Sequence, residues 1–254
     1  MDELLADVRA RLEEMGTEEG RRSAARFFKG QVACHGISSP DLKRYAAGLS
    51  RETKAWPVAR RDRFCTGLWK GGELENGILV TYLYGRFSKN FGEREFSLFE
   101  GWLGRFANNW AHCDALSAVL FAACIANHPE LAPRVLAWTG SGNRWKRRAA
   151  AAALVKSARA GRHTELALNV AERLRLDTDE MVQKGVGWLL KEVYPRRPVE
   201  AVEFLVSRPE PFPRLVLRYA AEKMSPVDRA RVLGWDLRSP ATQRSPAPRT
   251  RARR

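Results

Sequence analysis

Helical periodicity runs through almost all of this 254-residue chain, and it limits the possible folds more than any other feature. Apolar residues recur at helical spacing in successive segments, with Gly, Pro, Asn or Ser between them, and no segment reads convincingly as a strand. The chain is therefore expected to be all-α. The predicted helices cover residues 2–15, 18–29, 39–50, 56–70, 73–87, 94–105, 113–126, 129–138, 144–159, 163–174, 178–193, 198–208, 213–223 and 226–233.

Several predicted helices carry recognisable start signals. Ser39 before Pro40 and Ser225 before Pro226 each look like a Ser N-cap with Pro at the first helical position. Asp177 is a further expected N-cap, because Glu180 follows three residues later as in a capping box.

A faint repeat runs through the second half of the chain. Asp114, Arg148, Lys184 and Arg218 recur at intervals of about 35 residues, each followed by an apolar or small-residue helix. Paired helices of this period are typical of HEAT-like solenoids, whose curved stacks have a concave face. One polar anchor per repeat would give that face a basic groove. A non-repetitive helical bundle remains an alternative explanation of the pattern.

The charge of the chain indicates a polyanionic partner. It contains 44 Lys and Arg against 29 Asp and Glu, a formal net charge of +15. The excess is spread through the part expected to fold, which favours nucleic acid over a merely solvated basic surface. Residues 1–234 are expected to form one domain. Residues 235–254 are rich in Pro, Ser and Arg and are expected to be a disordered tail, either attracting phosphate or only adding solubility.

Other signals bear on location and cofactors. No apolar run approaches the roughly 20 residues of a membrane span, and the first residues carry acids in a helical pattern rather than a signal peptide. A cytoplasmic monomer without membrane contact is expected. The four cysteines lack zinc-site spacing and are expected to be buried or half-buried. No metal or cofactor is predicted, since no nucleotide, metal or serine-hydrolase motif is present.

Two tryptophans and two polar side chains are candidate site residues. Trp110 and Asp114 are four residues apart, as are Lys184 and Trp188, so each pair shares a helix face. Asp114 is expected near a helix N-terminus. A core tryptophan beside a helix-start acid would explain the first pair equally well. For the second pair, the adjacent glycines allow either a ligand or a tight helix crossing beside Trp188.

Arg147 and Arg148 begin an alanine-rich helix. A basic cluster at the head of a helix suits phosphate contact, but the same arginines could simply extend from a packing helix into solvent.

Four segments together resemble the DNA alkylation repair family of AlkD type, the HEAT-like alkylpurine DNA glycosylases. They are RFFKGQVACHGISSPDLKRYA, NNWAHCDAL, WKRRAAAAAL and QKGVGWLLKEVY, in the family's order. The resemblance extends from Phe27 to about Tyr194.

The resemblance implies a role for each matching residue. Asp114 would be the catalytic carboxylate, and Trp110 and Trp188 would flank the lesion's deoxyribose. Arg148, or the adjacent Arg147, would contact the DNA backbone. Phe27 stands where the family commonly has tyrosine, which removes one possible hydrogen bond to DNA. The predicted DNA-binding residues are Arg148, Arg147, Lys184, Phe27, Ser39 and Arg218.

The implied reaction is hydrolysis of the N-glycosidic bond of cationic N3- or N7-alkylated purines, such as 3-methyladenine and 7-methylguanine, in double-stranded DNA. A cationic base needs no general acid, and a carboxylate stabilises the oxocarbenium character of the sugar. The resemblance further implies that the base is not flipped out. The alternatives are a non-catalytic HEAT-like protein that binds bent or branched DNA, and a protein-binding scaffold.

Overall fold

The computed structural model describes residues 2–28, 32–208 and 210–234, and throughout these ranges the regular structure is helical, as predicted. The predicted tail, 235–254, lies outside the described residues. The helices are α1 (Asp2–Met15), α2 (Glu18–Phe27), α3 (Ser39–Glu52), α4 (Val58–Trp69), α5 (Leu74–Gly85), η1 (Ser88–Asn90), α6 (Glu93–Arg105), α7 (Trp110–Ala115), the π-helical η2 (Leu116–Phe121), α8 (Ala122–Asn127), the 3-10 helix η3 (Pro129–Gly140), α9 (Arg144–Ala152), α10 (Val155–Arg159), α11 (Thr164–Arg173), α12 (Glu180–Val193), α13 (Pro198–Val206), α14 (Arg214–Ala220), η4 (Ala221–Lys223) and α15 (Pro226–Leu233).

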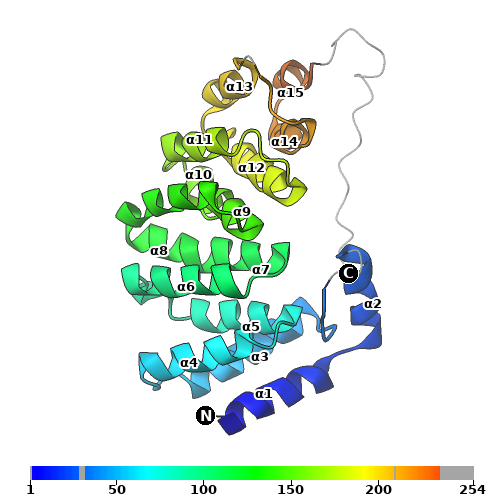
Figure 1. Ribbon diagram of the computed structural model, residues 1–254, viewed down its shortest axis with the longest axis vertical. Helices are drawn as coiled ribbons and strands as arrows, with labels where there is room; N and C mark the ends of the chain where they lie inside the picture. The colour runs from blue at the N-terminus through cyan, green and yellow to red at the C-terminus, as the bar shows by residue number, and fades with distance from the viewer. Residues whose placement is uncertain (1, 29–31, 209, 235–254) are drawn as a thin grey trace.

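The helices stack into a curved solenoid, with the N-terminus at one end and α13 to α15 at the other (Figure 1). One row consists of α3, α5, α7, α9, α12 and α14, each of which packs on the next. The second row includes α4, α6, η3 and α11, and η2 and α8 continue α7 without a break. This layout confirms the predicted HEAT-like solenoid. The repeat seen in the sequence corresponds to the first row, because Asp114, Arg148, Lys184 and Arg218 lie on four successive helices of it.

The core is continuous between the two rows. Its largest side chains are aromatic and fully buried, and Tyr84 and Phe99 both pack edge-on or tilted against Trp102. The alanine run allows close packing, since Ala149 to Ala153 are all buried. Cys65, Cys113 and Cys124 are buried and Cys34 is half-buried, as expected.

The helix caps confirm one prediction and correct two. The Ser225 hydroxyl accepts a hydrogen bond from the backbone of Asp228, as an N-cap should. At α3, however, the cap is Ser38, which accepts from Asp41, so Ser39 is already the first helical residue. At α12 the cap is Asp179, because its carboxylate accepts from Met181 and Val182.

One continuous helical stretch corrects the expectation that no apolar run approaches the length of a membrane span. Residues Trp110–Asn127 are long and apolar enough to cross a bilayer by length and composition, with a mean hydropathy of 1.3 over 18 residues. Half of this stretch is buried, and it packs against α5 and α9. Buried core helices pass the same test, so the stretch is weak evidence for a membrane span.

The two glycines of α12 sit where neighbouring helices come close. A Cβ added at Gly187 would lie 2.4 Å from Tyr219 Cβ and 3.0 Å from the Val216 carbonyl oxygen of α14. A Cβ at Gly185 would lie 3.2 Å from Arg148 Cγ of α9. The close approach predicted for these glycines is therefore real, and it is made by helices on both sides of α12.

We expect Gly187→Ala to destabilise the fold by about 1–3 kcal/mol, because the clash with α14 exceeds the gain in helix propensity of about 1 kcal/mol. The matched control is Gly48→Ala in α3, where a Cβ would meet no atom within 4 Å. There only the propensity gain remains, so the control should be stabilised by roughly 0.5–1 kcal/mol. Urea unfolding of the two variants measures both changes, and equal effects would contradict this account of α12.

Candidate active site

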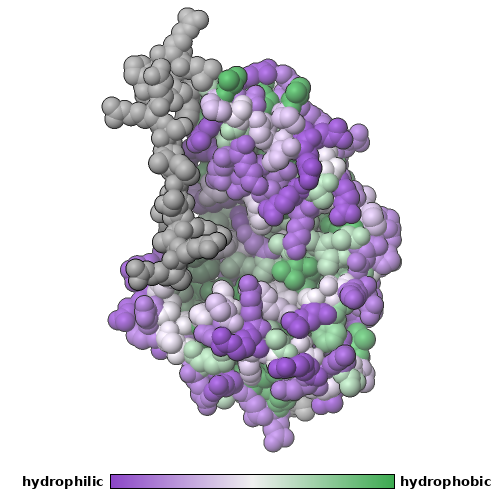
Figure 2. All heavy atoms as spheres, turned by 180° about the vertical axis from the view of Figure 1, so that it is seen from behind, coloured by the Kyte–Doolittle hydropathy of each residue, from purple (hydrophilic) through white to green (hydrophobic). Residues whose placement is uncertain are grey.

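A groove of about 1110 Å³ follows the ends of three successive helices of the first row, where α7, α9 and α12 begin. Seen from behind, hydrophilic side chains border a hollowed, more apolar band across the middle of the molecule (Figure 2). The groove is lined by Phe27, Phe28, Val32, Asn108, Asn109, Trp110, Asp114, Arg144, Trp145, Arg148, Thr178, Asp179, Glu180, Met181, Lys184, Trp188, Lys191 and Tyr219.

Asp114 and Arg148 form a bidentate ion pair in this groove. Arg148 Nε donates to Asp114 Oδ1 at 2.8 Å, and Nη2 donates to Oδ2 at 2.7 Å. A third donor, Nη1, reaches the Met181 carbonyl oxygen of α12 at 2.5 Å. The two residues occupy equivalent positions on adjacent helices, which explains why they meet. This geometry fixes the orientation of the Asp114 carboxylate.

The pair is more enclosed on the arginine side. The Arg148 side chain is 7% exposed, whereas that of Asp114 is 19% exposed and lines the groove. Burial alone would lower the pKa of Arg148, but the hydrogen bonds and negative charge of Asp114 outweigh burial and raise it. Arg148 is therefore a permanent cation behind a carboxylate that solvent or a ligand can reach.

Trp110 begins α7 and belongs to an aromatic cluster. Asn109 caps the helix by accepting a hydrogen bond from the His112 backbone. Phe28 stacks on Trp110, with ring centroids 5.0 Å apart and an interplanar angle of 20°. Phe27 meets the same ring edge-on at 5.3 Å and is 69% exposed. The end of α2 thus brings two phenylalanines to the groove.

A buried carboxylate positions α2 beside α7. Glu75, at the start of α5, accepts hydrogen bonds from the backbone N–H groups of His35, Gly36 and Ile37 at 2.8–3.1 Å. Gly36 has a φ of 85°, a conformation that favours glycine. Its carbonyl oxygen accepts from the Thr17 hydroxyl, which also caps α2. The start of α2 is therefore tied to the first row of helices.

Lys184, Trp188 and Lys191 present one face of α12 to the groove, at spacings of four and three residues. Lys184 pairs with Glu180 at 3.3 Å, and Lys191 pairs with Glu222 at 2.8 Å. Trp188 is half-buried and packs against the core. It therefore both packs and lines the groove, whereas the sequence had left these as alternatives.

The cations of the groove all have acidic partners. Besides the pairs of Arg148, Lys184 and Lys191, Arg144 pairs with Asp179 at 3.3 Å. A phosphate entering the groove would have to compete with these carboxylates. The net charge of +15 is therefore not concentrated as unpaired charge on the groove wall.

Three of the predicted DNA-binding residues do not line the groove. Arg147 turns away to Asp177, with Nε donating to Oδ2 at 2.6 Å. Ser39 is exposed at the start of α3, and Arg218 is exposed on α14. The structure brings Phe27, Trp110, Asp114, Arg148, Lys184 and Trp188 together.

Some groove residues were not predicted from the sequence. Lys191 was detectable in principle, because it lies three residues after Trp188 on the same helix face. Tyr219 lies one residue beyond the position given by the repeat. Phe28 was overlooked beside Phe27. Nothing in the local pattern distinguishes Arg144 and Trp145 from ordinary helix-start residues.

Below the groove, His112 is fully buried in a neutral form. Its Nε2 lies 2.9 Å from the Leu74 carbonyl oxygen and therefore donates to it, while the buried Nδ1 has no hydrogen-bond partner among the described residues. Burial lowers the pKa of His112 to about 4. Protonation of the folded protein would place a charge and a new N–H donor at this buried nitrogen, which costs free energy.

This burial predicts a loss of stability in acid. The unfolded chain takes up a proton on His112 as pH falls below about 6.5, whereas the folded chain does so only near pH 4. Stability from this group is therefore full at neutral pH and falls as the pH drops from about 6.5 to 4, by roughly 3 kcal/mol. The His112→Gln variant keeps an amide donor for the Leu74 carbonyl oxygen but has no group that titrates in this range. Between pH 6.5 and 4 its free energy of unfolding, measured with urea, should therefore fall by roughly 3 kcal/mol less than that of the wild type. Parallel pH profiles would rule out the assignment.

Comparison with known proteins identifies the family. The family model for DNA alkylation repair enzymes matches residues 8–224, which is most of the chain. The chain belongs to the DNA alkylation repair enzyme family. The family name makes this protein a DNA alkylation repair protein and indicates an enzyme with DNA as its partner.

Solved structures agree with this protein in fold. A predicted DNA alkylation repair enzyme from Enterococcus faecalis is similar with a TM-score of 0.75 and 20% identity, covering 83% of this chain and 97% of that one. The protein smu.31 from Streptococcus mutans gives a TM-score of 0.54 and 18% identity, covering 72% of this chain and 100% of that one. No match was found among curated proteins. At these identities the structural likeness shows the fold of the repair protein and not its reaction.

Proposed function

We propose that this DNA alkylation repair protein is a monofunctional DNA glycosylase that removes cationic N3- or N7-alkylated purines from double-stranded DNA. The observation that supports this most directly is the Asp114 carboxylate, held by two hydrogen bonds from Arg148 in a groove that Trp110 and Trp188 also line. Water attacks C1′ of the deoxyribose, the bond to the purine nitrogen breaks, and its electrons neutralise the departing base.

The charge of the lesion explains why one carboxylate is sufficient. Alkylation at N3 or N7 leaves the purine positively charged, so the base departs without protonation by a general acid. Positive charge develops on the sugar instead, and the Asp114 carboxylate stabilises it. Asp114 also orients the attacking water and accepts its proton. The faces of Trp110 and Trp188 add cation–π stabilisation of about 0.5–2 kcal/mol each.

The shape of the site favours attack on a sugar at the surface of the duplex. The groove extends over α7, α9 and α12, so its carboxylate belongs to a long surface rather than a deep base pocket. We therefore propose that the lesion stays stacked in the helix. Since one chain supplies every groove residue, the protein is proposed to act as a monomer.

The basic side chains of the groove have a separate task. Arg144, Lys184 and Lys191 are proposed to contact DNA phosphates after exchanging their carboxylate partners. Such contacts release counterions, so affinity for duplex DNA should fall steeply with added salt. Arg148 acts differently, because each of its three guanidinium nitrogens already donates to Asp114 or Met181; its proposed role is to position Asp114.

A second candidate function is non-catalytic binding of bent or branched DNA. Its support is that Arg148 engages both oxygens of Asp114, and that Phe27 replaces the tyrosine common in AlkD-type proteins. Both functions use the same groove, so DNA binding alone does not separate them.

The experiment that separates them follows abasic sites in methylated plasmid DNA. The protein is incubated with methylated and unmodified plasmid, and abasic sites are converted to nicks and counted on a gel. The proposal predicts nicks in the methylated plasmid well above the no-protein background, and none added in the unmodified one. Salt-sensitive DNA binding without added nicks would instead favour the non-catalytic function.

A further inference from the structure

A second cavity, of about 610 Å³, lies at the far end of α5 from the groove. The start of α5 is next to the groove, because the Leu74 carbonyl oxygen contacts His112 of α7. The other end of the helix supplies Tyr84, Arg86 and Phe87 to the second cavity. A helix of this length spans about 18 Å, and the two cavities share no lining residue. They are therefore separate sites.

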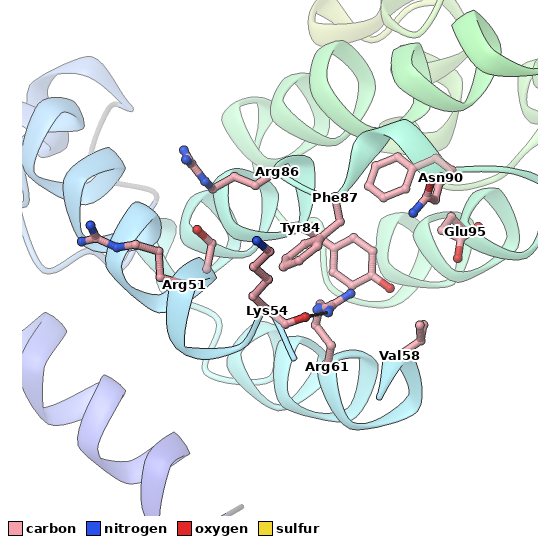
Figure 3. Close-up of a pocket in the computed structure, with 11 residues that line it drawn as sticks. Arg51, Lys54, Val58, Arg61, Tyr84, Arg86, Phe87, Asn90 and Glu95 are labelled. Atoms are coloured by element: carbon pink, nitrogen blue, oxygen red, sulfur yellow. Dashed lines mark hydrogen bonds between the residues drawn. The ribbon is translucent and has the colours of Figure 1, made fainter. Parts of the chain in front are cut away.

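Basic side chains gather on one side of this cavity. Arg51 comes from the last turn of α3, Lys54 from the turn after it, and Arg86 caps the end of α5. Figure 3 shows all three on one side of the Tyr84 and Phe87 rings, with Asn90 and Glu95 on the other. All three residues line the same cavity although they come from separate parts of the chain; the Lys54 amine lies nearest the rings, and the guanidinium groups of Arg51 and Arg86 extend away from them (Figure 3).

A fourth cation is built into the cavity wall. Arg61 of α4 is 6% exposed, and its guanidinium lies 3.6 Å from the centroid of the Phe87 ring. Its Nη2 donates to the carbonyl oxygens of Thr53, Lys54 and Trp56 at 3.3–3.4 Å, and its buried Nε has no partner within the described structure. Arg61 joins the segment that carries Lys54 to the aromatic wall.

The three outer cations differ from those of the groove. In the part of the chain that the structure describes, the side chains of Arg51, Lys54 and Arg86 have no hydrogen-bond or ion-pair partner. Glu95 is the carboxylate in the cavity lining. One of its oxygens pairs with Arg94 at 3.1 Å, and the other accepts a hydrogen bond from the Gly92 backbone N–H. The carbonyl ends of α3 and α5 each contribute only about half a negative charge. The four cations of the lining, less the one charge of Glu95 and the two half charges of the helix ends, leave an excess of about two positive charges, which matches a dianion.

We propose that this cavity binds a small organic phosphate, such as a mononucleotide, independently of the DNA groove. A phosphomonoester is mostly a dianion above pH 7 and offers several strong acceptors to Lys54, and to Arg51 and Arg86 when these exposed side chains turn toward it. The side chains of Phe87 and Val58 provide apolar surface for the organic part. The size of the cavity is in the usual range for small-molecule sites.

The test is isothermal titration calorimetry with adenosine 5′-monophosphate as the probe, beside adenosine and inorganic phosphate. We expect saturable binding of the monophosphate with a submillimolar Kd, and binding at least about 10-fold weaker for either part alone. Lys54→Ala and Arg86→Ala should each weaken binding by about 10-fold or more, since each loses a charge-assisted contact. Lys156→Ala, an exposed lysine outside both cavities, is the matched control and should bind as wild type does.

Three results would overturn the proposal. The first is no saturable binding of the monophosphate at millimolar concentration. The second is an equal loss in Lys156→Ala, which would show a response to net charge only. The third is a loss in Lys184→Ala with Lys54→Ala unaffected, which would place the nucleotide in the groove. None of these uses base release, so the proposed glycosylase reaction is tested separately.

Discussion

Replacing Asp114 by Asn is expected to reduce base release from methylated DNA by about 100- to 1000-fold while leaving DNA affinity nearly unchanged. The amide has nearly the shape of the carboxylate but carries no negative charge, so it cannot stabilise the developing positive charge of the sugar. It is also a poor base for the attacking water. The measurement is the single-turnover rate of base release at saturating protein, with binding followed on the same duplex.

Two features of the fold make this variant informative. Asn still offers one oxygen to Arg148, so at least one of the two hydrogen bonds persists. Asp114 is also not the cap of α7, because Asn109 has that role. The variant should therefore stay folded. Base release by this variant at the wild-type rate would show that the Asp114 carboxylate takes no part in the reaction.

Arg148→Met is the second variant with a large expected effect. It keeps the aliphatic stem that packs near Gly185 and removes the guanidinium. The loss leaves a half-buried carboxylate without its partner, which should cost about 2–3 kcal/mol of stability. Base release should fall by about 100-fold even where the protein is folded, because Asp114 loses its fixed orientation.

The neighbouring Arg147→Met is the matched control. Arg147 also holds a carboxylate, that of Asp177, but outside the groove. The Arg147→Met variant should be less stable than the wild type, but its rate of base release per folded molecule should change little. In addition, Asp114→Asn combined with Arg148→Met should be more stable than Arg148→Met alone, since no unpaired charge remains. Equal rate losses in the two arginine variants would contradict a specific role for Arg148.

The sequence predicts the helices, and six of its nine candidate site residues line one groove, for physical reasons. Helical periodicity and strong breakers such as Pro129 and Pro198 locate the elements. The repeat places Asp114, Arg148 and Lys184 on successive helices of one row, and three of the four anchors line the groove. Trp110 and Trp188 lie one turn from two of these anchors, so they face the same groove.

The local sequence pattern could not predict which side chains pair with each other between helices. Arg148 was expected to contact phosphate, and the local pattern gave no sign that two of its N–H groups hold Asp114, the equivalent residue of the preceding repeat. Asp177 looked like the cap of α12, whereas Arg147 holds it and Asp179 caps the helix instead. Phe28 stacks on Trp110, and Glu75 of α5 holds the backbone of His35, Gly36 and Ile37. Each of these depends on a partner distant in the sequence.

The most direct test of the central claim uses two duplexes that differ at one base, a cationic 7-methylguanine or a neutral hypoxanthine. The wild-type protein is incubated with each at saturating concentration, and the free bases are separated by chromatography over time. The account predicts release of 7-methylguanine well above the no-protein rate and no release of hypoxanthine, because only the cationic base leaves without a general acid. No release of 7-methylguanine from duplex that is fully bound would contradict the account.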